Sequence, residues 1–171
     1  MQSHFELFGL ALAYALDAEA LERSYRDIQS RVHPDRFASA GDAERRASLQ
    51  WTTRVNEAYR TLKDPVQRAR HFLELQGVDA GFESNTQMPG DFLLQQLELR
   101  EELGRAAGRK DTAALDALRA RLLSDRKSLQ AQIGEMIDGR KDYAGAVELV
   151  RELMFLDKVD SEIDLAYEAV E

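Results

Sequence analysis

The feature that most constrains the fold is Pro34, which lies between two long segments with apolar residues at helical spacing. A proline lacks a backbone N–H and disfavours helical geometry in the residue before it, so the first helix must end at Val32 or His33. The apolar faces are Leu21, Tyr25, Ile28 and Val32 in residues 18–32, and Trp51, Val55, Ala58, Tyr59 and Leu62 in residues 43–63. This pattern predicts an antiparallel helical hairpin with residues 33–35 at its exposed tip.

The remaining segments are also helical in pattern, and we expect an all-α protein with two domains. A shorter helix over residues 66–76 follows Pro65, which suits a first helical position, and completes a domain over residues 1–76. Turn-forming residues gather in residues 77–90, for which we predict a linker. Three helical segments over residues 91–107, 111–138 and 142–170 have short connections, which predict a three-helix bundle over residues 91–171.

The composition argues against several kinds of function. The sequence has no cysteine and its three histidines lie far apart, so we expect no disulfide, no metal site and no cofactor. It shows neither a signal-peptide start nor an apolar run of about 20 residues, which predicts a cytoplasmic protein that does not cross a membrane. Residues 77–171 have twelve basic and twenty acidic side chains, against eleven of each in residues 1–76, which disfavours nucleic-acid binding by the second half.

The candidate functional motif is the tripeptide His33-Pro34-Asp35 at the predicted tip. A rigid loop that exposes a histidine and an aspartate can form directional polar contacts, and the proline limits the entropy lost on docking. The helix before it shows Arg23 and Arg26 opposite the apolar face and Arg31 on the flank, which would steer an acidic partner. The alternative is a solvated helix face on which these arginines pair with Glu19, Glu22 and Asp27.

The first 76 residues resemble a J-domain. The similar segments are FELFGL, LERSYRDIQSRVHPDRF and VNEAYRTLKDPVQRARHFLEL. In that family the tripeptide and the basic face of the preceding helix dock onto a DnaK-type ATPase chaperone and stimulate its ATP hydrolysis. The resemblance implies a non-enzymatic co-chaperone whose chaperone-binding residues are His33, Pro34, Asp35, Arg23, Arg26, Arg31 and Arg36.

The likeness extends over nearly the whole chain, because DFLLQQLELREEL and ELMFLDKV resemble segments of the HscB family of iron–sulfur cluster assembly. That resemblance implies an L-shaped protein whose C-terminal three-helix domain holds the scaffold protein IscU and presents it to the chaperone HscA. It assigns scaffold binding to Leu93, Leu94, Leu97, Glu98, Glu101 and Phe155. One departure is Gly104-Arg105, where HscB-like chains tend to be acidic, and this puts that end of the surface in doubt.

A helical wheel gives residues 91–107 two apolar faces. Phe92, Leu99, Leu103 and Ala106 form one stripe, which we assign to the bundle core. Leu93, Leu94 and Leu97 point elsewhere, beside two carboxylates, as in a protein-binding surface. Phe155 lies off the Val147–Val150–Met154 stripe, so we expect it to join that surface. The alternative is that the second face packs against the first domain.

Three other functions remain as alternatives. The first is a J-protein that serves a general DnaK-type chaperone and a different client, and the second is a helical structural adaptor. The third, an enzyme with His33 and Asp35 as an acid–base pair, lacks a nucleophile, a phosphate loop and a site that excludes water. Direct iron–sulfur binding is disfavoured because clusters usually need cysteine thiolates.

Overall fold

The computed structural model describes residues 2–82 and 89–170, which are mostly helical and contain no strand, so the all-α prediction is confirmed. The chain divides into two compact units, Met1–Gly77 and Val78–Glu171. Unit 1 contains α1 (His4–Leu7), α2 (Ala18–Val32), the 3₁₀-helix η1 (Pro34–Phe37), α3 (Asp42–Lys63) and α4 (Pro65–Leu75). Unit 2 contains α5 (Gly90–Gly108), α6 (Thr112–Gly134), the π-helical turn η2 (Glu135–Gly139) and α7 (Tyr143–Val170).

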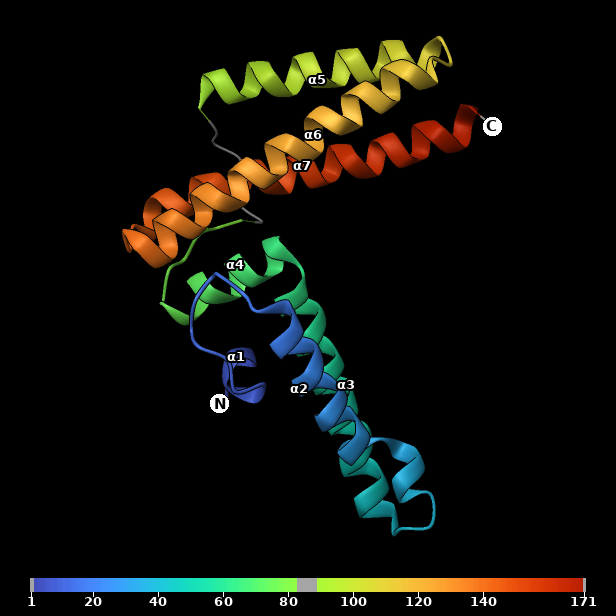
Figure 1. Cartoon of the computed structure of the whole chain (residues 1–171), viewed down its shortest axis with the longest axis vertical. Helices are drawn as coiled ribbons and strands as arrows, with labels where there is room; N and C mark the ends of the chain where they lie inside the picture. Colours follow the sequence, from blue (N-terminus) through green and yellow to red (C-terminus); the bar gives the residue numbers. More distant parts are fainter. Residues whose placement is uncertain (1, 83–88, 171) are drawn as a thin grey trace. The chain divides into compact units, whose positions relative to one another are not determined.

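In unit 1, α2 and α3 form the predicted antiparallel hairpin, and α4 lies across its open end (Figure 1). The Asp17 carboxylate caps α2 by accepting from the Ala20 N–H at 3.0 Å, and Asp64 caps α4 in the same way. α2 ends at Val32, as the proline requires. Each fully buried leucine or phenylalanine contributes roughly 1.5–3 kcal/mol to folding. The core of unit 1 consists of Phe5, Phe8, Tyr14, Leu21, Val55, Ala58, Leu62, Val66, Ala69, Phe72 and Leu73.

Trp51 does not lie on the buried face of α3, so that part of the prediction is wrong. Its side chain is 43% exposed, and the Arg54 guanidinium lies over its ring at 5.2 Å. The inner face at this level carries Ser48 and Thr52, whose hydroxyls contact the last carbonyl of α2 at Val32. Because α2 ends here, this part of α3 contacts the backbone at the end of α2 and not a further turn of apolar side chains. The Trp51 ring therefore finds no side chains of α2 to cover it.

The N-terminal helix α1 docks on α4 through a pair of histidines. The rings of His4 and His71 stack with centroids 4.2 Å apart. The Phe5 ring also stacks on His71, with centroids 5.8 Å apart. The backbone N–H of His4 donates to Nε2 of His71 at 3.3 Å. Burial is the main cause that lowers the pKa of both histidines below the ordinary value near 6.5. The neutral form of His71 therefore fits this contact, since a protonated Nε2 cannot accept a hydrogen bond.

The free energy of unfolding of unit 1 is expected to decrease as the pH is lowered from 7.5 to 5.5. Because both folded-state pKa values are lowered, the unfolded chain takes up protons more readily, and stability is complete above about pH 6.5 and is lost below it. Thermal unfolding across this range measures the slope. His71→Gln, which keeps an acceptor but cannot titrate, should flatten it, whereas His33→Gln should not. An equal slope in wild type and His71→Gln would contradict the assignment.

In unit 2, α6 and α7 run side by side along most of their lengths and α5 packs beside them (Figure 1). Ion pairs cross between the long helices, from Arg119 to Asp160 at 3.3 Å and from Arg126 to Asp157 at 2.5 Å. The predicted middle helix is shorter than expected, because η2 replaces its last turn and buries Ile137. The core comprises Phe92, Leu103, Ala106, Leu115, Leu118, Leu122, Leu129, Ile133, Ile137, Ala146, Val147, Val150, Leu153, Phe155, Leu156, Val159, Ile163 and Ala166.

Part of the predicted linker is attached to unit 2. The Arg151 side chain on α7 is only 8% exposed, and its guanidinium donates to the Ala80 carbonyl and to Glu148, the latter at 3.0 Å. The same group lies 5.9 Å from the Phe82 ring. Residues 78–82 therefore pack on α7 through a buried, partnered charge, and residues 83–88 of the predicted linker lie outside the described residues.

Candidate interaction surfaces

The tripeptide forms a hydrogen-bonded cap at the tip of the hairpin. His33 ends α2 with its N–H donating to the Gln29 carbonyl at 3.0 Å, and Pro34 begins η1. The Asp35 N–H donates to Nδ1 of His33 at 3.3 Å, and the Arg36 N–H donates to the His33 carbonyl at 3.0 Å. The side chains remain open to solvent, 91% exposed for Asp35 and 47% for His33. The loop thus presents a carboxylate and an imidazole on an ordered backbone.

The arginines of α2 are exposed, and each forms a local ion pair. Arg26 and Arg31 contact carboxylates of α2 at 2.8 Å, and Arg23 does so at 3.8 Å. The pairs agree with the alternative interpretation, a solvated helix face on which the arginines pair with Glu22, Asp27 and Glu19. Exposed pairs of this kind contribute about 0–1 kcal/mol and are screened by salt, so an acidic partner can replace them.

Glu22 has a second partner, because the Tyr59 hydroxyl on α3 donates to it at 2.5 Å. That hydrogen bond, followed by the one from Arg26, lowers the pKa of the Glu22 carboxyl.

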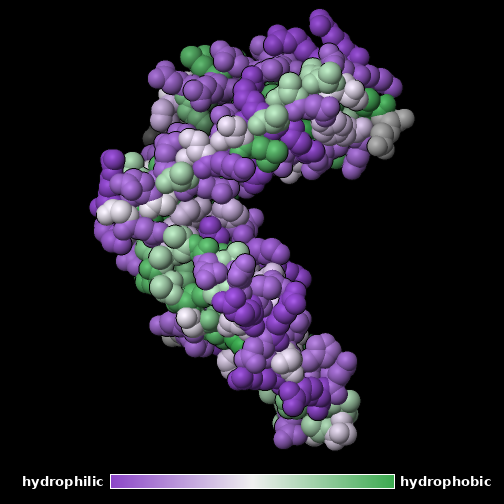
Figure 2. Space-filling view, in the orientation of Figure 1, coloured by the Kyte–Doolittle hydropathy of each residue, from purple (hydrophilic) through white to green (hydrophobic). Residues whose placement is uncertain are grey.

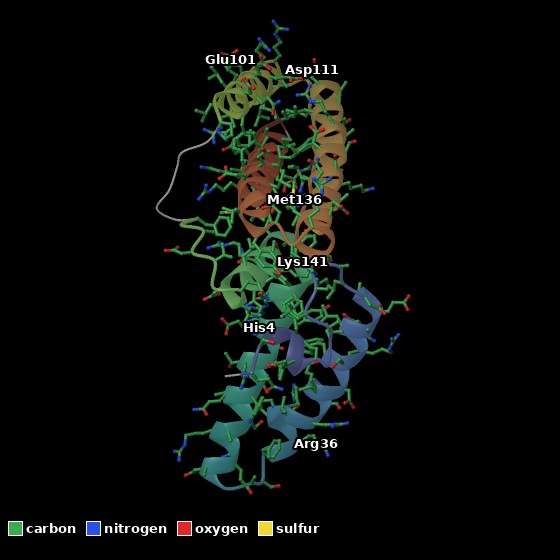
Figure 3. The ribbon with its side chains drawn as sticks, turned by 90° about the vertical axis from the view of Figure 1, so that its left-hand side faces the viewer. His4, Arg36, Glu101, Asp111, Met136 and Lys141 are labelled. Carbon is green, nitrogen blue, oxygen red and sulfur yellow. The ribbon has the colours of Figure 1, made fainter. Side chains whose placement is uncertain are left out.

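Arg36 differs from the arginines of α2, since its guanidinium donates to the Ser30 carbonyl at 3.1 Å. It lies at the tip of the hairpin, at the far end of unit 1 from His4 (Figure 3). Arg36 therefore braces the tripeptide loop as well as adding charge to it.

The predicted two faces of α5 are confirmed by the burial of its side chains. Phe92, Leu103 and Ala106 are buried and Leu99 is half-buried. On the other face, Leu93, Leu94 and Leu97 are 49%, 60% and 56% exposed, and Glu98 and Glu101 beside them are exposed too. We call these five residues the α5 patch. Figure 2 shows apolar surface near the start of α5 among mostly hydrophilic atoms, and Figure 3 shows Glu101 on the outer side of the helix.

Phe155 does not belong to this exposed surface, and the expectation that it would is wrong. Its side chain is 7% exposed and meets Phe92 edge to face, with ring centroids 5.6 Å apart. The Arg100 guanidinium of α5 lies 5.5 Å from the same ring. The reason is that α7 packs against both α5 and α6, so it needs a second buried stripe beside the one read from the sequence. Phe155 lies beneath α5 and supports the helix that carries the patch.

Replacing Phe155 by alanine is expected to destabilise unit 2 by roughly 3–5 kcal/mol, because it removes a buried ring and leaves a cavity under α5. Urea unfolding monitored on unit 2 measures this change. The matched control is Leu94→Ala on the exposed face, which should stay within about 0.5 kcal/mol of wild type. Equal stabilities of the two variants would contradict the burial of Phe155.

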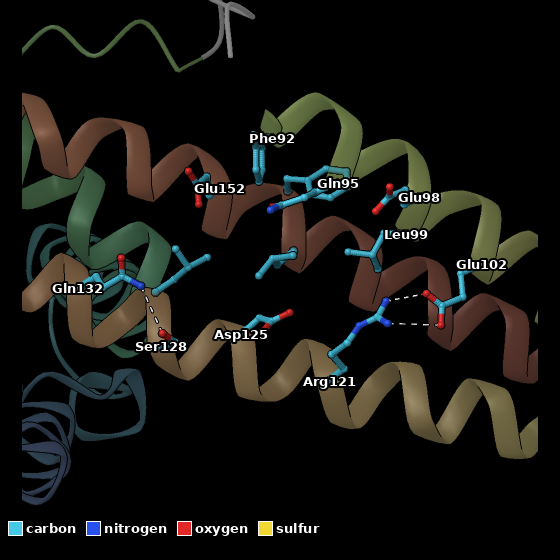
Figure 4. A pocket seen from close by; sticks show the side chains of 13 residues that line it. Phe92, Gln95, Glu98, Leu99, Glu102, Arg121, Asp125, Ser128, Gln132 and Glu152 are labelled. Atoms are coloured by element: carbon cyan, nitrogen blue, oxygen red, sulfur yellow. Dashed lines mark hydrogen bonds and ion pairs between the residues drawn. The ribbon is translucent and has the colours of Figure 1, made fainter. Parts of the chain in front are cut away.

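A cleft of about 480 Å³ lies between α5, α6 and α7, and no sequence pattern predicted it (Figure 4). The side chains that line it include the buried Phe92 and Leu129 and three carboxylates, those of Glu98, Asp125 and Glu152. Burial, followed by the neighbouring Glu148 charge, raises the pKa of the Glu152 carboxyl. Arg121 spans the cleft's edge to Glu102 at 2.7 Å. Because Glu98 also belongs to the α5 patch, the cleft extends that surface with further acidic groups.

The fold is that of a J-domain co-chaperone: a helical hairpin with His-Pro-Asp at its tip, and a separate unit of three long helices. A family model described as the HSCB C-terminal oligomerisation domain matches residues 88–164. The co-chaperone protein HscB homolog of Burkholderia mallei (strain SAVP1) is 51% identical, over 99% of this chain and 96% of the relative. The chain belongs to the HscB family of co-chaperones.

Solved structures agree with this assignment. The chaperone HscB from Vibrio cholerae is 33% identical and has a TM-score of 0.86, with 99% of each chain covered. Human co-chaperone protein HscB has the same fold, with a TM-score of 0.90 at 24% identity, over 96% of this chain and 82% of that one. In the described part of the chain, no helix is long and apolar enough to cross a membrane. Within residues 2–82 and 89–170, no three His, Asp or Glu side chains gather as metal ligands would.

Proposed function

We propose that this co-chaperone links an iron–sulfur scaffold protein of the IscU kind to a DnaK-type chaperone of the HscA kind. The α5 patch binds the scaffold. His33-Pro34-Asp35, with Arg23, Arg26, Arg31 and Arg36, docks on the chaperone and stimulates its ATPase, which promotes maturation or transfer of the cluster. The sequence has no cysteine, and clusters are usually held by cysteine thiolates, so in this proposal the cluster stays on the scaffold. This chain then acts as a helper protein, and the compartment we propose is the cytoplasm.

The observation that supports this function best is the presence of two exposed surfaces of different chemistry on two separate units. The tip of unit 1 is polar and small, as suits a directional contact that is made and broken during a nucleotide cycle. The α5 patch of unit 2 is apolar with a carboxylate rim, as suits a protein-binding surface. Gly104 and Arg105, both exposed, follow the patch, so its acidic rim is short at that end.

The function is tested by measuring the ATPase rate of purified HscA-type chaperone with this chain, with scaffold, and with both. We expect this chain alone to raise the rate and both proteins together to raise it further. Calorimetry between this chain and the scaffold measures the second contact directly. Stimulation of a general DnaK-type chaperone, without scaffold binding, would instead identify a J-protein with a different client.

A further inference from the structure

The C-terminal end of α2 is held by groups from outside the helix. The last carbonyls of any helix lack partners within it and must find donors elsewhere. Here the His33 N–H reaches the Gln29 carbonyl, the Arg36 guanidinium reaches the Ser30 carbonyl, and the Arg36 N–H reaches the His33 carbonyl. Pro34 has no N–H to offer at the point where the chain turns. The carbonyl just before the tripeptide therefore needs a donor from another element.

That carbonyl, on Val32, receives two hydroxyl groups from α3. Ser48 Oγ donates to it at 2.5 Å and Thr52 Oγ1 at 3.1 Å. The two hydroxyls are four residues apart, so they lie one above the other on the same face of α3 and converge on one acceptor. The Ser48 side chain is 4% exposed although it is polar, so its hydroxyl depends on this bond.

We propose that Ser48 and Thr52 are positioning residues that hold His33-Pro34-Asp35 in its docking geometry. The inference rests on the proposed function of the tripeptide as the contact with the ATPase chaperone. The Val32 carbonyl belongs to the planar peptide group that joins Val32 to His33, so fixing its direction fixes the direction in which the loop leaves the helix. Arg36 holds the loop from the side of α2, and the two hydroxyls hold it from α3.

If Ser48 and Thr52 only stabilised unit 1, their removal would have a different effect. If the hydroxyls served only to join α2 to α3, their removal would lower the stability of unit 1 and leave the docking of folded molecules unchanged. As positioning residues, they keep the loop in the conformation that binds, so their removal lowers the fraction of folded molecules ready to dock. The apparent affinity for the chaperone falls by that fraction, whereas the maximal rate of the bound complex does not change.

The test compares the double variant Ser48→Ala/Thr52→Val with wild type in the ATPase assay, using the full chain at a temperature where both are folded by circular dichroism. We expect the concentration for half-maximal stimulation to rise about three- to tenfold, with the maximum unchanged. The conservative variant Ser48→Thr/Thr52→Ser keeps both hydroxyls and should stay within about twofold of wild type. Thr53→Val is the matched control, because Thr53 Oγ1 donates to Leu49 within its own helix. An unchanged half-maximal concentration in the double variant would overturn the inference.

A second readout needs no partner and separates this inference from the proposed function. Backbone order parameters from NMR relaxation are expected to fall at His33, Asp35 and Arg36 in the double variant, from about 0.85 to below about 0.7, and to stay constant in the middle of α3 near Val55. If wild type failed to stimulate the chaperone, the proposed function would fall, and this readout would still decide whether the hydroxyls order the loop. Unchanged order parameters at the tip, or an equal loss along both helices, would overturn it.

Discussion

The variant His33→Gln is expected to lose most of its stimulation of the chaperone ATPase while it keeps its fold and its scaffold binding. Nδ1 of His33 accepts the Asp35 N–H, so the imidazole both orders the loop and presents its Nε2 edge to a partner. Glutamine can supply neither the ring plane nor the same acceptor position. Removing one partner of a buried polar contact in the docked complex costs about 2 kcal/mol, which is roughly thirtyfold in affinity.

This prediction is measured as the ATPase rate of the chaperone at a fixed, sub-saturating concentration of the variant. Scaffold binding by calorimetry should equal that of wild type, because the α5 patch belongs to the other compact unit. The thermal unfolding temperature at pH 7.5 should also change little, since His33 is substantially exposed. Normal stimulation by this variant would exclude His33-Pro34-Asp35 as the docking motif.

The second large effect is expected from Leu93→Ala/Leu97→Ala, which should weaken scaffold binding by about 100-fold. Two leucines at the centre of a protein interface together contribute roughly 3 kcal/mol when they become fully buried on binding. Both are about half exposed in the free chain, so their truncation removes little from the core of unit 2. The loss should therefore appear in affinity and not in stability.

Calorimetry with the purified scaffold measures the affinity, and urea unfolding confirms that the variant is folded. Leu165→Ala is the matched control, because this leucine is 64% exposed on α7 and lies outside the α5 patch. The ATPase rate with the variant alone should equal that with wild type, whereas the additional rise caused by scaffold should disappear. Equal losses in the patch variant and in Leu165→Ala would show that the contact is not specific to α5.

Much of the candidate site could be predicted because it depends on local rules. Pro34 requires α2 to end at Val32, and the helical period separates the buried Phe92 from the exposed Leu93 and Leu97. Both inferences need only the backbone geometry of one helix and its neighbouring residues. The chaperone-binding and scaffold-binding roles came from the resemblance to known families and are proposals for this chain.

The errors share one cause, which is that periodicity describes one helix and does not identify what packs against it. Trp51 fits the apolar face of α3, but α2 has ended at that level and the ring stays exposed. Phe155 falls off the stripe read for α7, but α5 covers it there. In both cases the neighbouring element, which lies far away in sequence, decides the burial.

The sequence by itself determined that the chain is helical, where α2 stops, and that residues 33–35 lie in an exposed turn, because proline geometry and helical spacing act over a few residues. Only the tertiary structure showed that Ser48 and Thr52 bind the Val32 carbonyl, that Arg151 holds Ala80 on α7, and that a cleft continues from the α5 patch. Each of these depends on hydrogen bonds or packing between elements 16 or more residues apart, and such contacts exist only once the helices have assembled.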